Sequence, residues 1–465
     1  MSLTATELDY LDASRIRQDD IDATESARAH REATTNRRAR RRRWGLLVAG
    51  VIRPDNRPSV AVLNYHTGRG AGAVDTLVAD GLDRAAAKFD IDVREFASPM
   101  TDIDDAIDTA TDAGTDLIVA LFGVAGEPNP PIGARRARSV WGYIDVVVPG
   151  SPSLIFAEHE GSFLVGAAAA LTSRTGTIGF VGGFQIGIVE RFRAGFEAGA
   201  RAVNPSVEIL ATYLDYYAHA FSRDDLARAA ATTMYARGAD VIFHAAGEAG
   251  YGVFAAARAS STPERHLWAI GADSDQYLDV DPLVRQHVLT SMVKKFDVAV
   301  YELVRMLVDD ELRPGVRLLG LADNAVDYST TGGHLCSATI AELERYRKEI
   351  VAGTRIVPSA PDGPLEPPAG STVTSTLTVT FDGATCRHDA PAAIRRGVVR
   401  VVLVNTGHAD GSVELSGGGG DMVHVPANAG GTNSGYAKLD DGLYDVQCNS
   451  GFETTFAGPS LKVGS

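Results

Sequence analysis

Lysine, cysteine and long apolar runs are all scarce in this chain of 465 residues. The 44 basic side chains are outnumbered by 59 acidic ones, and the net charge of −15 argues against a general nucleic-acid binder, which must neutralise phosphates. The three cysteines, Cys336, Cys386 and Cys448, exclude a disulfide-rich scaffold and a zinc site with four thiolates. No apolar run approaches the roughly 18 residues that a membrane-spanning helix needs.

What is present is a globular composition, with 45% hydrophobic and 22% charged residues. At about 100–200 residues per domain, the length predicts two or three domains. Eleven histidines are scattered without the spacing of a metal site, and nothing resembles a nucleophile–base pair. We therefore expect no metal, no cofactor and no catalytic step.

Residues 1–57 form a basic tail. Six arginines lie between Arg37 and Arg43, and the apolar run Trp44–Ile52 follows directly. As a helix this run spans about 13 Å against a hydrocarbon core of about 30 Å, so it cannot cross a bilayer alone. Three interpretations stay open: a solvated helix end, a shortened anchor whose arginines attract anionic headgroups, and, least favoured, a nucleic-acid arm. The tail also resembles the juxtamembrane segment of large actinobacterial regulators.

Residues 58–355 alternate between short β-branched runs and helical stretches, which predicts an α/β fold with parallel sheets. Strands are predicted at 59–64, 91–96, 116–122, 143–148, 177–181, 208–213, 240–244, 267–271 and 288–292, and helices at 74–89, 102–113, 161–173, 188–203, 223–237, 251–259 and 298–308. Because so many units exceed one sheet, we expect two doubly wound lobes with a cleft between them. Ligands of such folds bind outside the carboxyl ends of the strands.

The pattern changes again near the C-terminus. Residues 356–373 are rich in proline and predict an extended linker. Residues 374–465 lose the helical period, and strands are predicted at 375–381, 397–405, 412–415 and 443–448. Short strands at this spacing predict a small all-β sandwich.

Three groups of residues follow predicted strands and are candidate ligand contacts. Asp273 offers a carboxylate to paired hydroxyls, although a turn or capping aspartate has the same appearance. Lys294 and Lys295 are conspicuous because lysine is rare, but a solvated pair explains them equally well. The glycines between Gly247 and Gly252 permit close backbone approach, and their spacing matches neither a P-loop nor a dinucleotide fingerprint.

Six motifs in order give residues 58–325 a specific family resemblance. They are His159–Gly166 (HEGSFLVG), Gly179–Gly183 (GFVGG), Phe192–Gly199 (FRAGFEAG), Ala239–Gly247 (ADVIFHAAG), Ile270–Gln276 (IGADSDQ) and Leu289–Lys295 (LTSMVKK). The chain resembles the BMP (basic membrane protein) family, the nucleoside-binding components of ABC importers. The resemblance implies the periplasmic-binding-protein-like type I fold, with two lobes joined by a three-strand hinge, working as a monomer.

The resemblance also implies ligand contacts. Asp273 and Lys294 would hold ribose hydroxyls, the backbone near Gly247 and Gly250 would contact the ligand, and Phe221 would stack on the base.

The base-reading half of the site departs from the family pattern. Ala71 and Val74 replace the family's base-reading aspartate and stacking phenylalanine, and the loop 123–131 also differs. Losing one stack and one buried hydrogen bond weakens nucleoside binding about 30- to 1,000-fold if nothing compensates.

Residues 374–465 resemble a cupredoxin-like sandwich of actinobacterial proteins, on the strength of Thr380–Cys386 (TFDGATC) and Tyr444–Cys448 (YDVQC). Neither His nor Met follows Cys448 closely, so a blue-copper site is rejected. A Cys386–Cys448 disulfide is expected if the domain lies outside the cell, and two separate thiols are the alternative.

We predict a non-catalytic solute-binding protein that takes a nucleoside or a related hydroxylated molecule for an ABC-type importer, with an ABC permease as partner. The alternative is a ligand-sensing module of a membrane-associated regulator with altered or lost nucleoside specificity. The added β domain and the lack of a lipoprotein cysteine before Cys336 favour that alternative. The tail predicts membrane association, with the extracytoplasmic face favoured and the cytoplasm left open because no complete signal peptide is present.

Overall fold

The computed structural model describes residues 57–64, 73–97, 114–121, 139–363, 365–417, 423–452 and 454–464. The basic tail up to residue 56, the first loop with Ala71, the predicted helix 102–113 and the loop 123–131 lie outside the described residues. Among the helices that are described, none is both long enough and apolar enough to span a bilayer.

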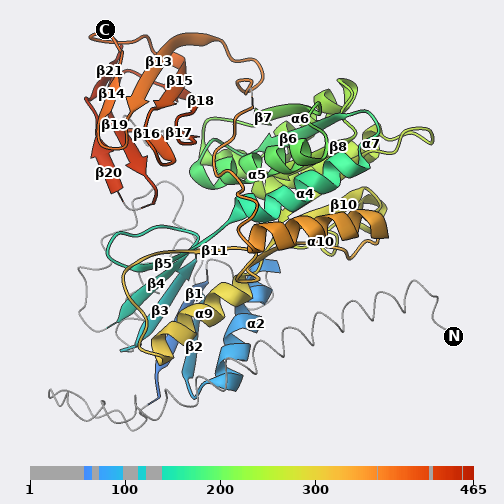
Figure 1. Ribbon diagram of the computed structural model, residues 1–465, viewed down its shortest axis with the longest axis vertical. Helices are drawn as coiled ribbons and strands as arrows, with labels where there is room; N and C mark the ends of the chain where they lie inside the picture. The colour runs from blue at the N-terminus through green and yellow to red at the C-terminus, as the bar shows by residue number, and fades with distance from the viewer. Residues whose placement is uncertain are drawn as a thin grey trace. The chain divides into compact units, whose positions relative to one another are not determined.

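The first lobe is built on a sheet of six parallel strands. Their order is β11 (Gly315–Leu319), β5 (Pro152–Phe156), β4 (Val140–Ile144), β3 (Leu117–Leu121), β1 (Ser59–Asn64) and β2 (Asp92–Ala97). Every residue of β3 is buried, as expected for a parallel strand covered on both faces. Helices α2 (Ala73–Lys88) and α9 (Phe296–Val308) pack against each other beside these strands (Figure 1).

The second lobe also has a six-stranded sheet, parallel except at one edge. Its order is β12 (Val326–Tyr328), β10 (Val288–Lys294), β9 (Trp268–Asp273), β8 (Val241–Ala245), β6 (Thr177–Gly182) and β7 (Glu208–Tyr213), with β12 antiparallel to β10. The helices of this lobe are α4 (Glu158–Thr172), α5 (Gly187–Val203), α6 (Asp224–Ala236), α7 (Tyr251–Ser260), the short α8 (Pro282–Arg285) and α10 (Ser337–Val351), with the 3₁₀ turns η3 (Ala218–Ser222) and η4 (Gly247–Gly250).

The chain crosses between the lobes three times. It passes from β5 into α4, from β10 into α9, and from β11 to β12. The crossings are hydrogen-bonded to one another: Ala157 N donates to Leu319 O (2.8 Å) and Lys295 N donates to Ala325 O (2.8 Å). The structure therefore has the two lobes that the strand–helix pattern predicted and the three-segment hinge that the family resemblance implied.

Helices α4 and α5 lie in close contact in the second lobe (Figure 1). A side chain on Gly195 would clash with the backbone of His159, and one on Gly199 would clash with the backbone of Phe163. The glycines of the FRAGFEAG motif thus serve helix packing rather than ligand contact, because only glycine permits this approach.

The C-terminal β domain consists of two sheets. One has the order β14 (Cys386–His388), β13 (Val373–Phe381), β15 (Gly397–Asn405) and β18 (Thr432–Leu439); the other has β17 (Val423–Ala427), β16 (Gly411–Gly417), β19 (Gly442–Ser450) and β20 (Thr454–Ala457), with β21 (Leu461–Val463) on β19. Cys386 and Cys448 form a disulfide between the two sheets, with Cα atoms 5.6 Å apart.

Some strand bounds agree with the sequence, and one differs where the backbone turns. The strands predicted at 59–64, 208–213 and 397–405 have the observed bounds. The strand predicted at 143–148 instead begins at Val140 and ends at Ile144, because Asp145 has a φ of 69° that an extended strand does not allow.

Candidate functional site

Lys294, the last residue of β10, lies in a cluster of three carboxylates that come from both lobes. Its Nζ pairs with Asp145, which follows β4 of the first lobe, and lies 3.5 Å from Glu158 Oε1 and 3.6 Å from Asp273 Oδ1. The side chains of Lys294, Asp145 and Glu158 have no exposed area, whereas that of Asp273 is 37% exposed. The cluster therefore joins strand ends of the two sheets and reaches solvent at Asp273.

Two of these carboxylates belong to residues with an unusual backbone φ angle. Asp145 has a φ of 69° and Asp273 a φ of 66°, which places both in the left-handed region. Few residues other than glycine adopt it, and aspartate and asparagine tolerate it best. Such conformations concentrate at functional sites, where they aim a side chain that an ordinary strand end would direct elsewhere.

The charges of the cluster do not cancel. Three carboxylates face Lys294 and Arg191, whose Nε donates to Glu158 Oε2 at 2.6 Å, so full ionisation leaves one negative charge in excess. Burial raises the pKa of Asp145 to about 6, although Lys294 opposes this shift. Burial would also raise the pKa of Glu158, but Arg191 and Lys294 outweigh it and hold that pKa below its usual value.

Lys294 keeps its charge despite complete burial. Burial alone would lower its pKa, but Asp145, Asp273 and Glu158 together raise it above the usual value. The ammonium also lies 5.1 Å from the ring centroid of Phe156 and 5.4 Å from that of Phe296, within cation–π range. Lys294 is therefore a fixed hydrogen-bond donor in a dry setting.

Two acceptor atoms of the cluster have no hydrogen-bond partner among the described residues. They are Asp145 Oδ1 and Glu158 Oε1, both buried. Buried polar atoms are rarely left without a partner, so these oxygens can take donors from a bound molecule. The arrangement suits a small molecule with hydroxyl groups, which donate to carboxylates and accept from an ammonium.

The other predicted contacts gather at the ends of β6 and β8. Phe221 lies in η3. A Cβ atom added to Gly183 would clash with the Phe221 ring, and one added to Gly247 would lie 3.4 Å from the Phe221 side chain. Gly247 has a φ of 55°, which favours glycine. Gly250 has a different setting, because a side chain there would clash with the buried ring of His244. Val74 is half-buried in the first turn of α2 and packs on the core.

Sequence reasoning missed three members of the cluster. Asp145 lay inside a predicted strand, Glu158 directly precedes the HEGSFLVG motif, and Arg191 directly precedes the FRAGFEAG motif. Burial is what distinguishes them, and burial of a loop aspartate has no local sequence signal. The position of Asp145 at a strand end became apparent only from the observed bounds of β4.

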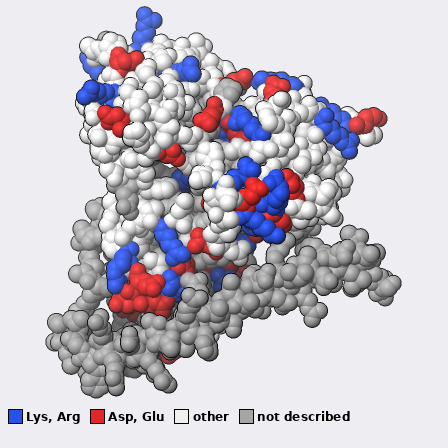
Figure 2. Space-filling view, viewed as in Figure 1, with Lys and Arg blue, Asp and Glu red and all other residues white. Residues whose placement is uncertain are grey.

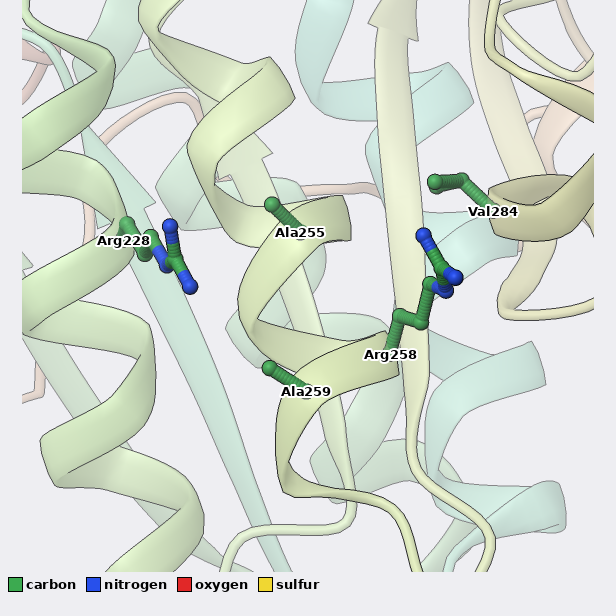
Figure 3. A pocket seen from close by; sticks show the side chains of 5 residues that line it. All are labelled: Arg228, Ala255, Arg258, Ala259 and Val284. Atoms are coloured by element: carbon green, nitrogen blue, oxygen red, sulfur yellow. The ribbon is translucent and has the colours of Figure 1, made fainter.

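A pocket of about 410 Å³ lies elsewhere on the second lobe, between α6, α7 and α8 (Figure 3). It is lined by Arg228, Ala255, Arg258, Ala259 and Val284, none of which was predicted to contact ligand. Helix flanks rather than strand ends form it, so we place the candidate site at the Lys294 cluster instead. On the face shown in Figure 2, basic and acidic side chains are interspersed.

Comparisons with known proteins identify the family. The family model for PnrA-like ABC transporter substrate-binding proteins matches residues 59–360. A CD4+ T-cell-stimulating antigen of Listeria innocua is 32% identical over 266 residues, which cover 55% of this chain and 73% of that protein. Basic membrane protein A of Borreliella afzelii is 28% identical over 287 residues, covering 60% of this chain and 85% of that protein.

Solved structures show the same fold. An ABC transporter solute-binding protein from Aeropyrum pernix K1 superposes with a TM-score of 0.51 at 24% identity, covering 65% of this chain and 94% of its own. One from Conexibacter woesei also gives a TM-score of 0.51, at 18% identity, covering 65% of this chain and 99% of its own.

Proposed function

Because the chain belongs to the PnrA-like family of ABC transporter substrate-binding proteins, we propose that it binds a nucleoside or a related hydroxylated molecule between its lobes and delivers it to an ABC permease. The proposal involves binding without a catalytic step. Its site is the Lys294 cluster, with Asp273 and Lys294 as the contacts to a vicinal diol.

One observation carries the proposal. Lys294 offers a fixed donor, while Asp145 Oδ1 and Glu158 Oε1 are buried acceptors without a hydrogen bond from the described residues. A diol both donates and accepts, so it complements this set, and charge-assisted hydrogen bonds of this kind are the stronger ones. Because Asp145 and Lys294 belong to different lobes, a ligand held by both favours lobe closure.

The opposite end of the ligand has fewer contacts. Phe221, which lies beside Gly247, can stack on one face of a ring of the ligand. The replacement of the family's base-reading residues by Ala71 and Val74 favours a modified base or weaker base recognition. We therefore propose that specificity comes mainly from the sugar end.

We further propose that the C-terminal β domain is cupredoxin-like without copper ligands, and that the protein works on the extracytoplasmic face. The Cys386–Cys448 disulfide supports this location, because disulfides persist in oxidising compartments.

Isothermal titration against ribonucleosides, their 2′,3′-dideoxy forms, free bases and sugars tests the proposal. We expect ribonucleosides to bind, dideoxynucleosides to bind at least about tenfold more weakly, and free bases not to bind. Equal affinity for ribo and dideoxy forms would refute the diol assignment. No binding of any nucleoside at millimolar concentration would refute the nucleoside class.

A further inference from the structure

The C-terminal β domain lies beyond the residues that the family model matches, and it interlocks with the second lobe. Gln185, in the loop between β6 and α5, accepts through Oε1 from Tyr436 N (3.1 Å) and through its backbone carbonyl from His424 N (3.3 Å). A Cβ on Gly435 would clash with the Gln185 amide, and one on Gly187 would lie 3.1 Å from His424 Nε2. Each side of the interface thus has a glycine that receives a side chain from the other side.

The segment that leads into the β domain is hydrogen-bonded to helix α5. Arg193, buried completely in α5, donates through Nη2 to Gly363 O at 2.6 Å. Glu197 Oε2 accepts from Gly363 N at 3.0 Å, and Tyr436 donates through its hydroxyl to Leu365 O at 3.2 Å. Charge-assisted hydrogen bonds in a buried setting are strong, so the domain is held against α5 rather than loosely tethered.

Arg191 connects this interface to the ligand cluster. Its guanidinium carbon lies 5.4 Å from the ring centroid of Phe452, in the turn between β19 and β20. Its side chain is only 13% exposed, and its Nε donates to Glu158, whose other oxygen lies 3.5 Å from Lys294 Nζ. Three successive contacts therefore lead from the β domain to the ammonium in the cleft.

We propose that the C-terminal β domain is a positioning element of the ligand site, in which Phe452 holds the Arg191 guanidinium against Glu158. With its charge matched by Arg191, Glu158 does not draw the Lys294 ammonium away from Asp145 and Asp273. Arg191 is a positioning residue, since it acts on the cleft through Glu158. This inference rests on the proposed function only in its effect on ligand binding, because the contacts between Phe452, Arg191 and Glu158 need no ligand.

Ligand binding by full-length variants gives the first test, with adenosine as the probe. Phe452→Leu keeps an apolar side chain but removes the ring, and we expect adenosine affinity to fall about 3- to 10-fold. Phe452→Tyr retains the ring and should restore wild-type affinity. Leu443→Ala, which changes an exposed apolar residue of the same domain, is the matched control and should have no effect. Equal affinity for wild type and Phe452→Leu would overturn the proposal.

Hydrogen exchange without ligand gives the second test. We expect amides of residues 156–166, where α4 begins, to exchange about 3- to 10-fold faster in Phe452→Leu than in wild type, with Phe452→Tyr and Leu443→Ala unchanged. If adenosine fails to bind the wild type, the proposed function fails, and hydrogen exchange alone then tests whether Phe452 positions Arg191 against Glu158. The same exchange rates in Phe452→Leu and Leu443→Ala would overturn that role of Phe452.

Discussion

Lys294 and Asp145 form a fully buried ion pair although they lie 149 positions apart and stand at the ends of strands of different sheets. Lys294 ends β10 in the second lobe and Asp145 follows β4 in the first. The pair therefore links a strand end of one lobe to a strand end of the other. In our proposal a bound diol shares that ammonium, which links ligand binding to the relative position of the lobes.

Replacing Lys294 should cost more stability than replacing its neighbour. Lys294→Met leaves buried carboxylates without their cation, and we expect a loss of about 3–5 kcal/mol in the free energy of unfolding. Lys295→Met is the matched control, because Lys295 pairs with Asp327 while 25% exposed and should contribute about 0–1 kcal/mol. Chemical denaturation measures both. Equal losses would contradict a special role for the buried pair.

The assignment of Asp273 is best tested with asparagine. Asn tolerates the left-handed backbone at φ 66° and keeps the shape of the side chain, whereas Ala adds backbone strain to the loss of the carboxylate. We expect Asp273→Asn to weaken nucleoside binding about 10- to 100-fold with an unchanged melting temperature. Asp275→Asn in the same loop serves as the control in the titration. Unchanged affinity in Asp273→Asn would show that this carboxylate does not contact the ligand.

The interlocking of Gln185 and Gly435 predicts a non-additive pair of mutations. Gly435→Ala alone pushes a methyl group into the Gln185 amide and should lower the free energy of unfolding by about 1–3 kcal/mol. In the Gln185→Ala background the shortened side chain leaves room, so the same substitution should cost much less. A double-mutant cycle by chemical denaturation gives this coupling. Additive effects would mean that the two residues do not meet in solution.

His244 should make the protein sensitive to acid. Its ring is buried, and burial lowers its pKa to about 4, although the side chain of Gln276 opposes this shift. A folded-state pKa below the unfolded value of about 6.5 gives stability that is present above pH 6.5 and lost as pH falls towards 4, by up to about 1.4 kcal/mol per pH unit.

The free energy of unfolding of two histidine variants, measured against pH, tests this expectation. His244→Gln should flatten the fall in stability between pH 6.5 and 4, while His408→Gln, at an exposed position, should leave it unchanged. Asp145 and Glu190, whose pKa values burial raises to about 6 and about 7, act in the opposite sense. They are present in all three proteins and cancel in the comparison. Parallel pH profiles for wild type and His244→Gln would contradict the expectation.

Local sequence patterns determined much of the architecture. Short β-branched runs such as 59–64 and 208–213 alternate with amphipathic stretches, and that periodicity alone predicts parallel sheets in two lobes. In the two lobes, strands β5, β11 and β12 were missed. The strand-end rule and the family resemblance also brought Asp273 and Lys294 forward as candidates.

Tertiary structure alone decided which side chains meet. Asp145 and Arg191 have no local feature that marks them, and they acquire a role because burial removes water and strengthens their pairing with Lys294 and Glu158. The same holds for the β domain: β13, β15, β16 and β19 were predicted, whereas the contact with Gln185 was not. Periodicity reports which face of an element is buried, whereas contacts between distant residues depend on how the buried faces pack together.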